Sequence, residues 1–102
     1  MATLYIAEYP GEGHGGGTGI VLLPFAPEPP LVEQTVAISG TSAASNSFSA
    51  STALIRVHTD SICSILVGSS PVATTTNKRL AADTTEYFAV TPGAKISVIA
   101  NT

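Results

Sequence analysis

The chain has 102 residues, a net charge of −3 and only 11% charged residues. A chain of this length folds as one domain with a modest core, and such a domain has little room for a deep, walled active site. Its four cations are too few for the phosphate contacts of ordinary nucleic-acid binding, so we predict that nucleic acid is not a partner.

The polar surface has to be built mainly from serine and threonine, because charged residues fall well below the roughly 25% usual in soluble domains. Hydroxyl groups are desolvated more easily than charges, so such a surface favours assembly. No apolar run approaches the ~20 residues that cross a bilayer, and the N-terminus lacks the pattern of a signal peptide. We therefore expect a protein made in a cytoplasm with no membrane partner, and the single Cys63 agrees with that compartment.

The N-terminal third carries most of the glycine and proline residues. Residues 3–9 are rich in β-formers and end at a Pro-Gly turn, so they predict a strand. A glycine-rich loop over 11–19 follows. Nearby prolines keep the apolar stretch 20–25 out of a central strand or helix, which predicts an extended, semi-rigid arm. We assign residues 1–33 to this strand, loop and arm, and residues 34–102 to a compact β domain.

Apolar side chains on such an arm need a cover, which is either their own domain or a neighbouring subunit, and both alternatives stay open. Lys78 and Arg79 lie in a polar stretch that we expect to be an exposed loop, where their charges would orient a docked partner. The candidate interface residues are Leu4, Tyr5, Ile6, Tyr9, Ile20, Val21, Leu22, Leu23, Phe25, Lys78 and Arg79.

The rest of the chain alternates short β-rich runs with turn residues. The serine- and alanine-rich segment 40–50 has no helical period, so we expect a loop there. Strands are predicted at residues 34–39, 50–58, 62–67, 72–76, 86–91 and 95–100.

Turn residues and the alternation of apolar with polar side chains predict the fold class. Residues 91–94, Thr-Pro-Gly-Ala, place proline and glycine where a type II turn requires them. Ile55 and Val57 alternate with Arg56 and His58, so one face of that strand suits a core. Six or seven short strands of this kind predict an all-β fold, a small antiparallel β-sandwich or jelly-roll-like barrel with an extended N-terminal arm.

Two patterns that carry chemistry in other proteins lack their context here. Residues 11–16 satisfy G-x-G-x-x-G, but a proline-rich segment follows where dinucleotide binding needs a helix, and no Lys-Ser or Lys-Thr closes a phosphate-binding loop. His58 and Asp60 with Ser61 or Ser64 have the residue types of a hydrolytic triad, yet the nucleophile pattern G-x-S-x-G is missing. We predict no catalytic residues and no cofactor.

Metal binding has few candidate ligands. Glu8, Glu12 and His14, or several copies of His58 around a symmetry axis, supply suitable carboxylate and imidazole groups. The chain has only two histidines and no H-x-H or C-x-x-C spacing, so we predict no metal site. Cys63 lies in an apolar strand and is expected to be a buried, unreactive thiol.

A resemblance to known proteins rests on residues 53–65, 68–74 and 80–82, on residues 85–90 with Pro92 and Gly93, and on residues 4–9 and 36–39. Together they resemble the small virion structural proteins encoded among the head genes of tailed bacteriophages. The resemblance implies a virion protein on the capsid surface, a decoration or cement protein that binds the major capsid protein lattice and forms a homo-oligomer, with a trimer favoured. It transfers no functional residues.

Two other functions stay open. One is a tail or fibre component of a phage, in which the same domain would join or cap a tube. The other is a carbohydrate-binding module that stacks sugars on Tyr5, Tyr9, Tyr87 or Phe88, although aromatic residues serve more often in core and interface packing.

Overall fold

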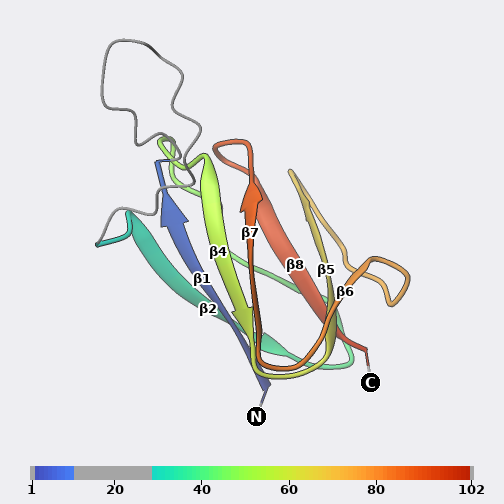
Figure 1. Cartoon of the computed structure of the whole chain (residues 1–102). Helices are drawn as coiled ribbons and strands as arrows, with labels where there is room; N and C mark the ends of the chain where they lie inside the picture. Colours follow the sequence, from blue (N-terminus) through green and yellow to red (C-terminus); the bar gives the residue numbers. More distant parts are fainter. Residues whose placement is uncertain (1, 11–28, 102) are drawn as a thin grey trace.

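The computed structural model of the chain describes residues 2–10 and 29–101, which form strands and loops but no helix (Figure 1). The expected all-β class is therefore confirmed, while the expected arm at 20–25 lies outside the described residues. The strands are β1 (Ala2–Tyr9), β2 (Val32–Ile38), β3 (Ala43–Ala44), β4 (Leu54–Thr59), β5 (Cys63–Gly68), β6 (Lys78–Leu80), β7 (Thr84–Ala89) and β8 (Lys95–Ala100).

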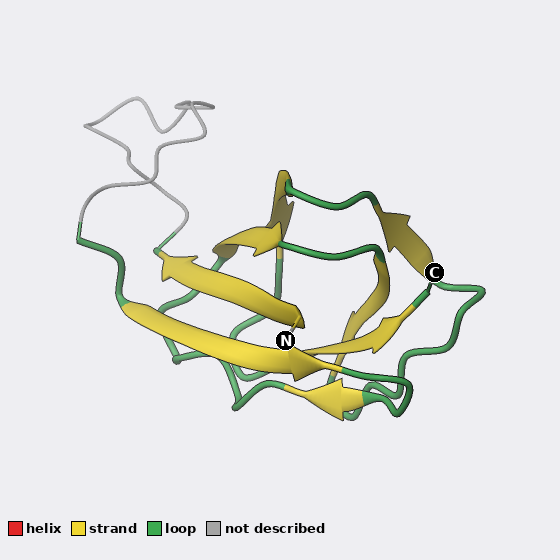
Figure 2. Cartoon of the chain, turned by 90° about the horizontal axis from the view of Figure 1, so that it is seen from below, coloured by secondary structure: helices red, strands yellow, loops and turns green. Residues whose placement is uncertain are grey.

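The strands form two antiparallel sheets that pack as a sandwich (Figure 2). Sheet A has the order β2-β1-β4-β7 and sheet B the order β3-β8-β5-β6. If β1 is counted after β8, so that β2 becomes strand 1 and β1 strand 8, the two orders read 1-8-3-6 and 2-7-4-5. This is the strand order of an eight-stranded jelly roll, with the first strand of the chain in the place of the last.

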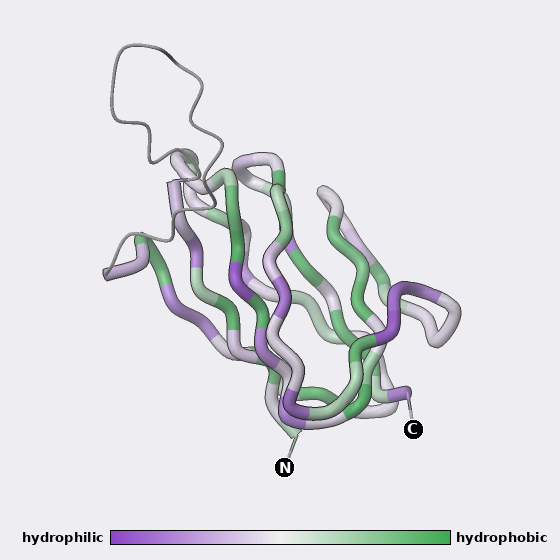
Figure 3. Tube along the Cα trace, viewed as in Figure 1, coloured by the Kyte–Doolittle hydropathy of each residue, from purple (hydrophilic) through white to green (hydrophobic). Residues whose placement is uncertain are grey.

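Burial alternates along β4, as the sequence predicts, and Figure 3 shows hydrophobic and hydrophilic residues alternating along this strand. In β4, Ile55 and Val57 are fully buried, whereas Arg56 and His58 point to the opposite face. The core between the sheets consists of Leu4, Ile6, Val36, Ile38, Phe48, Ile55, Val57, Cys63, Ile65, Leu80, Ala94, Ile96 and Val98.

The turn between β7 and β8 is the type II turn that the sequence predicts. The amide of Ala94 donates to the carbonyl oxygen of Thr91 at 3.1 Å. Gly93, the third residue of the turn, has a φ of 84°, which residues with a side chain rarely adopt.

Several expected boundaries were wrong. The predicted strand over 72–76 is absent, the expected loop at 40–50 contains β3, and β4 starts only at Leu54. Lys78 and Arg79, expected in a loop, are exposed but lie on strand β6. The very short strands β3 and β6 form because the longer strands β8 and β5 provide backbone groups for them to pair with. The β-propensity of a short segment does not indicate whether such a neighbour is present.

The connection between β5 and β6 folds back over the outer face of sheet B. The amide of Ala73 donates to Oγ of Ser42, beside β3 at the far edge of that sheet, at 2.9 Å. Asn101 Nδ2 donates to Ser64 Oγ at 2.7 Å and to the carbonyl oxygen of Thr75 at 3.1 Å. Ser64 and Ser97, which point outward from sheet B, are consequently fully buried.

The domain includes the first strand of the chain. β1 lies inside sheet A, paired with β2 on one side and β4 on the other. The boundary expected after residue 33 falls within β2, so residues 2–9 belong to the same sandwich as residues 34–101.

Candidate functional site

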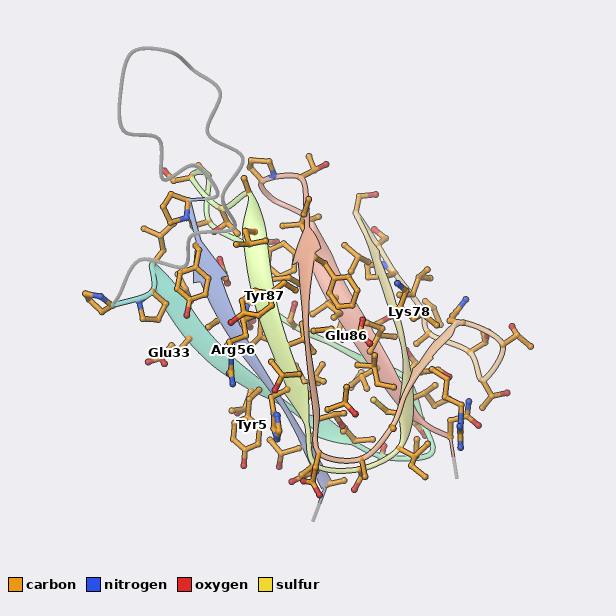
Figure 4. The ribbon with its side chains drawn as sticks, viewed as in Figure 1. Tyr5, Glu33, Arg56, Lys78, Glu86 and Tyr87 are labelled. Carbon is orange, nitrogen blue, oxygen red and sulfur yellow. The ribbon has the colours of Figure 1, made fainter. Side chains whose placement is uncertain are left out.

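The outer face of sheet A carries the most distinctive group of exposed side chains among the described residues. We call it the tyrosine face. Figure 4 shows four of its members gathered over β2, β1 and β4. The tyrosine face consists of the outward-pointing side chains of Tyr5, Glu33, Thr35, Arg56, His58 and Tyr87.

Strand register places these side chains in two rows across the sheet. In the first row, Tyr5 of β1 lies opposite Thr35 of β2 and opposite His58 of β4. In the second row, Ala7 of β1 lies between Glu33 and Arg56. Because the alanine is small, the row is lowest at its centre.

The result is a shallow depression of about 580 Å³ with an acidic and a basic side chain on either side of an alanine. Tyr5, Thr35 and His58 also line it.

Two tyrosines border the polar centre of this face. Tyr5 is 46% exposed and Tyr87, which lies opposite Arg56, is 50% exposed. The ring centroids of Tyr5 and His58 are 6.2 Å apart at an interplanar angle of 49°. His58 Nδ1 and Thr85 Oγ1 share a hydrogen bond of 2.8 Å, which fixes the imidazole plane beside the tyrosine.

The side chains of the tyrosine face suit a protein interface in which they become buried against a partner. Tyrosine and arginine dominate the energetic centres of protein interfaces, since each covers a large area with few rotatable bonds and also offers hydrogen-bonding groups. The tyrosine face contains no lysine, the residue that most resists desolvation.

The structure exposes some of the candidate interface residues and buries others. Tyr5 lies on the tyrosine face, but Leu4, Ile6 and Tyr9 are 0–3% exposed and offer no surface to a partner. Leu4 and Ile6 are buried because they point from β1 into the core between the sheets, a direction that the sequence does not reveal. Residues 20–25 lie outside the described residues.

Lys78 and Arg79 lie on the edge strand of the other sheet. Lys78 Nζ sits 4.8 Å from the centroid of the Phe88 ring, so it contributes to closing one side of the sandwich.

The sequence reasoning missed the grouping of Glu33, Arg56 and Tyr87. They come from three different strands, and only the pairings β1–β2, β1–β4 and β4–β7 bring them onto one surface. The alternation within β4 did indicate that Arg56 lies on the face opposite the core, whereas no core face was predicted for the strand that contains Tyr87.

The residues considered for a hydrolytic triad do not bond to one another in the structure. His58 bonds to Thr85, and Asp60 Oδ1 accepts a hydrogen bond of 2.8 Å from the amide of Thr3. Ser64 lies in sheet B, fully buried, and Ser61 belongs to a turn closed by its amide and Thr59 Oγ1.

Cys63 is a buried thiol, as the sequence predicts. Burial raises its pKa, a nearby hydrogen bond to Thr59 lowers it, and the Asp60 charge raises it further. Among the described residues, no group of three histidine, cysteine, aspartate or glutamate side chains could hold a metal ion.

Glu8 is the one fully buried acidic residue in the described part of the chain. Its Oε1 accepts hydrogen bonds from the amide of Ser49 at 2.9 Å and from Thr52 Oγ1 at 2.7 Å. Its Oε2 accepts one from Gln34 Nε2 at 2.9 Å. Gln34 Oε1 in turn accepts from the amide of Asn46 at 2.9 Å. The carboxylate is thus fully used in tying the segment 46–52 to β1 and β2.

Comparison of the chain with protein-family models, curated proteins and solved structures finds no match. The described residues contain no helix that could span a bilayer. Any functional proposal therefore rests on the residues of this chain.

Proposed function

We propose that this chain is a non-enzymatic structural protein of a tailed-bacteriophage virion, a decoration or cement protein that binds the outer surface of the capsid and stabilises the head. Its partners are the major capsid protein lattice and further copies of itself, and it is made in the host cytoplasm. The observation that carries the proposal is the tyrosine face, a half-exposed aromatic and arginine surface on a protein with very few charges.

The mechanism needs no chemistry. Docking of Tyr5 and Tyr87 against the lattice removes their rings from water, while Arg56 and Glu33 select a partner surface with complementary charges. A protein that binds only the assembled shell stabilises it by mass action. Many copies, each with modest affinity, add their effects over one particle.

The sequence resemblance to phage head proteins and the low charge support this proposal. The jelly-roll strand order is compatible with it, since that architecture serves in capsid and lectin domains, but the same order occurs with many functions.

The test measures binding of the purified protein to undecorated capsids of the phage that encodes it, by co-sedimentation and by cryo-electron microscopy. We expect regular density over the capsid surface. Tyr5→Ala and Tyr87→Ala should each weaken binding by about 10-fold or more, the effect of losing an interface anchor.

Val72→Ser is the matched control, because Val72 is also an exposed apolar residue but lies on the connection that covers sheet B. It should bind like the unmodified protein. Failure of the unmodified protein to bind capsids, or equal losses in Val72→Ser and the tyrosine variants, would contradict the proposal. Density confined to the tail would assign the protein to the tail instead.

A carbohydrate-binding module is the second candidate. The depression places a half-exposed tyrosine ring beside a carboxylate and a guanidinium, and this combination suits a sugar ring with several hydroxyl groups. Glycan-array binding by the isolated protein that is lost in Tyr5→Ala, without capsid binding, would favour this function.

A further inference from the structure

The two edges of sheet A are built differently. β2 forms one edge and β7 the other, and Figure 1 shows β2 at the outer margin of the molecule. An edge strand exposes a row of backbone amides and carbonyls that can pair with another strand, so proteins usually guard such edges.

In the part of the chain that the structure describes, the backbone groups of β2 that do not bond to β1 belong to its odd-numbered residues. The amide of Asp60 donates to the carbonyl oxygen of Thr3, so the odd residues of β1 direct their backbone groups toward β4. In an antiparallel sheet the next residue points the other way, so the even residues of β1 bond to the even residues of β2. Glu33, Thr35 and Ala37 are left with their amides and carbonyls directed outward.

The β7 edge is guarded by side chains. Glu86 points inward from this edge strand, where it pairs in register with Val57 of the core face. An inward-pointing charge is a known device against strand pairing, because a second strand would bury it. Lys78 of β6 lies over the neighbouring Phe88 ring, and Figure 4 shows both Lys78 and Glu86 on this side of the sandwich.

Within residues 2–10 and 29–101, no such device guards the β2 edge. Its only charged residue, Glu33, points outward onto the tyrosine face, and the inward Gln34 is already bonded to Glu8. The strand is seven residues long with no proline or lysine. Val32 at its start is 37% exposed and the adjacent Leu31 is 45% exposed.

We propose that β2 pairs antiparallel with β2 of a second copy, around a two-fold axis at Thr35, and joins the two A sheets into one eight-stranded sheet. In the register that overlaps all of residues 32–38, each residue number and its partner's add up to 70. Thr35 then pairs with Thr35 of the second copy, and Glu33 with Ala37. These are hydrogen-bonded pairs, since all of them are odd-numbered residues.

This register satisfies the side chains as well as the backbone. Exposed Val32 comes opposite Ile38 of the second copy, which covers apolar surface. The two Glu33 carboxylates stay roughly 13 Å apart along the strands, because four residues separate their positions. The two tyrosine faces become one continuous surface, an isologous arrangement in which two weak binding sites act together.

The pairing does not depend on the proposed function. It predicts a dimer, whereas the resemblance to phage proteins implies a trimer, so the mass of the protein in solution distinguishes the two. We expect sedimentation equilibrium and light scattering to show a monomer–dimer equilibrium with no trimer.

Thr35→Pro is the decisive variant. Since the Thr35 amide faces outward, proline at this edge position should leave the sandwich folded, but it removes two hydrogen bonds of the dimer and should raise the dissociation constant at least about 100-fold. Ala89→Pro is the matched control, because Ala89 occupies the equivalent outward position on β7, and its dimer should be unchanged. Circular dichroism and thermal unfolding check that both variants fold.

Two lysine variants test the register and serve if Thr35→Pro does not fold. Thr35→Lys places like charges opposite each other and should weaken the dimer, whereas Ala37→Lys comes opposite Glu33 and should strengthen it about two- to five-fold at low salt only, the effect of an exposed ion pair. A monomer at about 0.1 mM, a trimer, unchanged dimerisation in Thr35→Pro or Thr35→Lys, or loss of the dimer in Ala89→Pro would each overturn the proposal.

Discussion

Exchanging the two partners of the partly buried Glu8–Gln34 hydrogen bond gives a sharp test of the network around Glu8. In Glu8→Gln, the amide oxygen can keep the bonds from Ser49 and Thr52, but the amide NH₂ then faces Gln34 Nε2 across 2.9 Å. Gln34 cannot turn over to accept, because its Oε1 already holds the Asn46 amide at 2.9 Å. One partly buried hydrogen bond is replaced by two facing donors, which should cost about 1–3 kcal/mol of unfolding free energy.

Gln34→Glu alone should also destabilise the protein, because two carboxylates would face each other. In the double variant the donor and acceptor are exchanged: the amide introduced at position 8 donates to the carboxylate introduced at position 34, and that carboxylate still accepts from the Asn46 amide. Only the long, exposed bond of 3.4 Å from Gln34 Nε2 to the Asn46 carbonyl oxygen is lost. We expect the double variant to return to within about 1 kcal/mol of the unmodified protein, with a favourable coupling of about 1–3 kcal/mol.

Urea unfolding followed by circular dichroism measures this cycle, since a change of this size shifts the midpoint by about 1 M at a typical slope. Additive effects of the two single substitutions, or a Glu8→Gln variant within about 0.5 kcal/mol of the unmodified protein, would refute the role assigned to the network. Glu8→Ala extends the series. It leaves three hydrogen-bond donors without their acceptor and should lower the unfolding free energy by about 3–5 kcal/mol.

Two further predictions concern backbone strain and titration. Gly93→Ala should lower stability by about 1–2 kcal/mol in thermal unfolding, because a Cβ is strained at a φ of 84°, and a gain in stability would contradict the turn assignment. Burial raises the pKa of Cys63, so the thiol's contribution to stability should be complete below about pH 8.5 and decline as the pH rises toward its native pKa. Cys63→Ala should remove that decline, and native Cys63 should react with thiol reagents only on the timescale of unfolding, so rapid labelling would show an accessible thiol.

Local sequence chemistry determined the elements that depend on few residues. The Pro-Gly pair at 92–93 predicted the type II turn, because only glycine readily adopts a positive φ there. Alternation predicted which face of β4 meets the core, because side chains on a strand repeat with period two. These features required no knowledge of the neighbouring strands.

The tertiary neighbours of a segment decided whether it became a short strand and where it lies. Residues 72–76 are rich in β-branched side chains, yet they cross sheet B, and the Ala73 amide donates to the Ser42 hydroxyl instead of joining a ladder. β3 lies in a serine- and alanine-rich segment and is a strand only because β8 pairs with it. A propensity scale describes one residue and its neighbours, so it cannot supply this information.

The sequence by itself determined an all-β fold of short antiparallel strands, the core face of β4 and a low content of charged residues, because periodicity, turn residues and composition are properties of short segments. The tertiary structure decided that Glu8 is buried, since its donors come from residues 26, 41 and 44 positions away. It also decided that Tyr5, Glu33, Arg56 and Tyr87 share one surface, since three strand pairings bring them together. Both features depend on which strands become neighbours. Pairing between strands that are distant in the sequence is determined by the packing of the whole chain and not by any short segment.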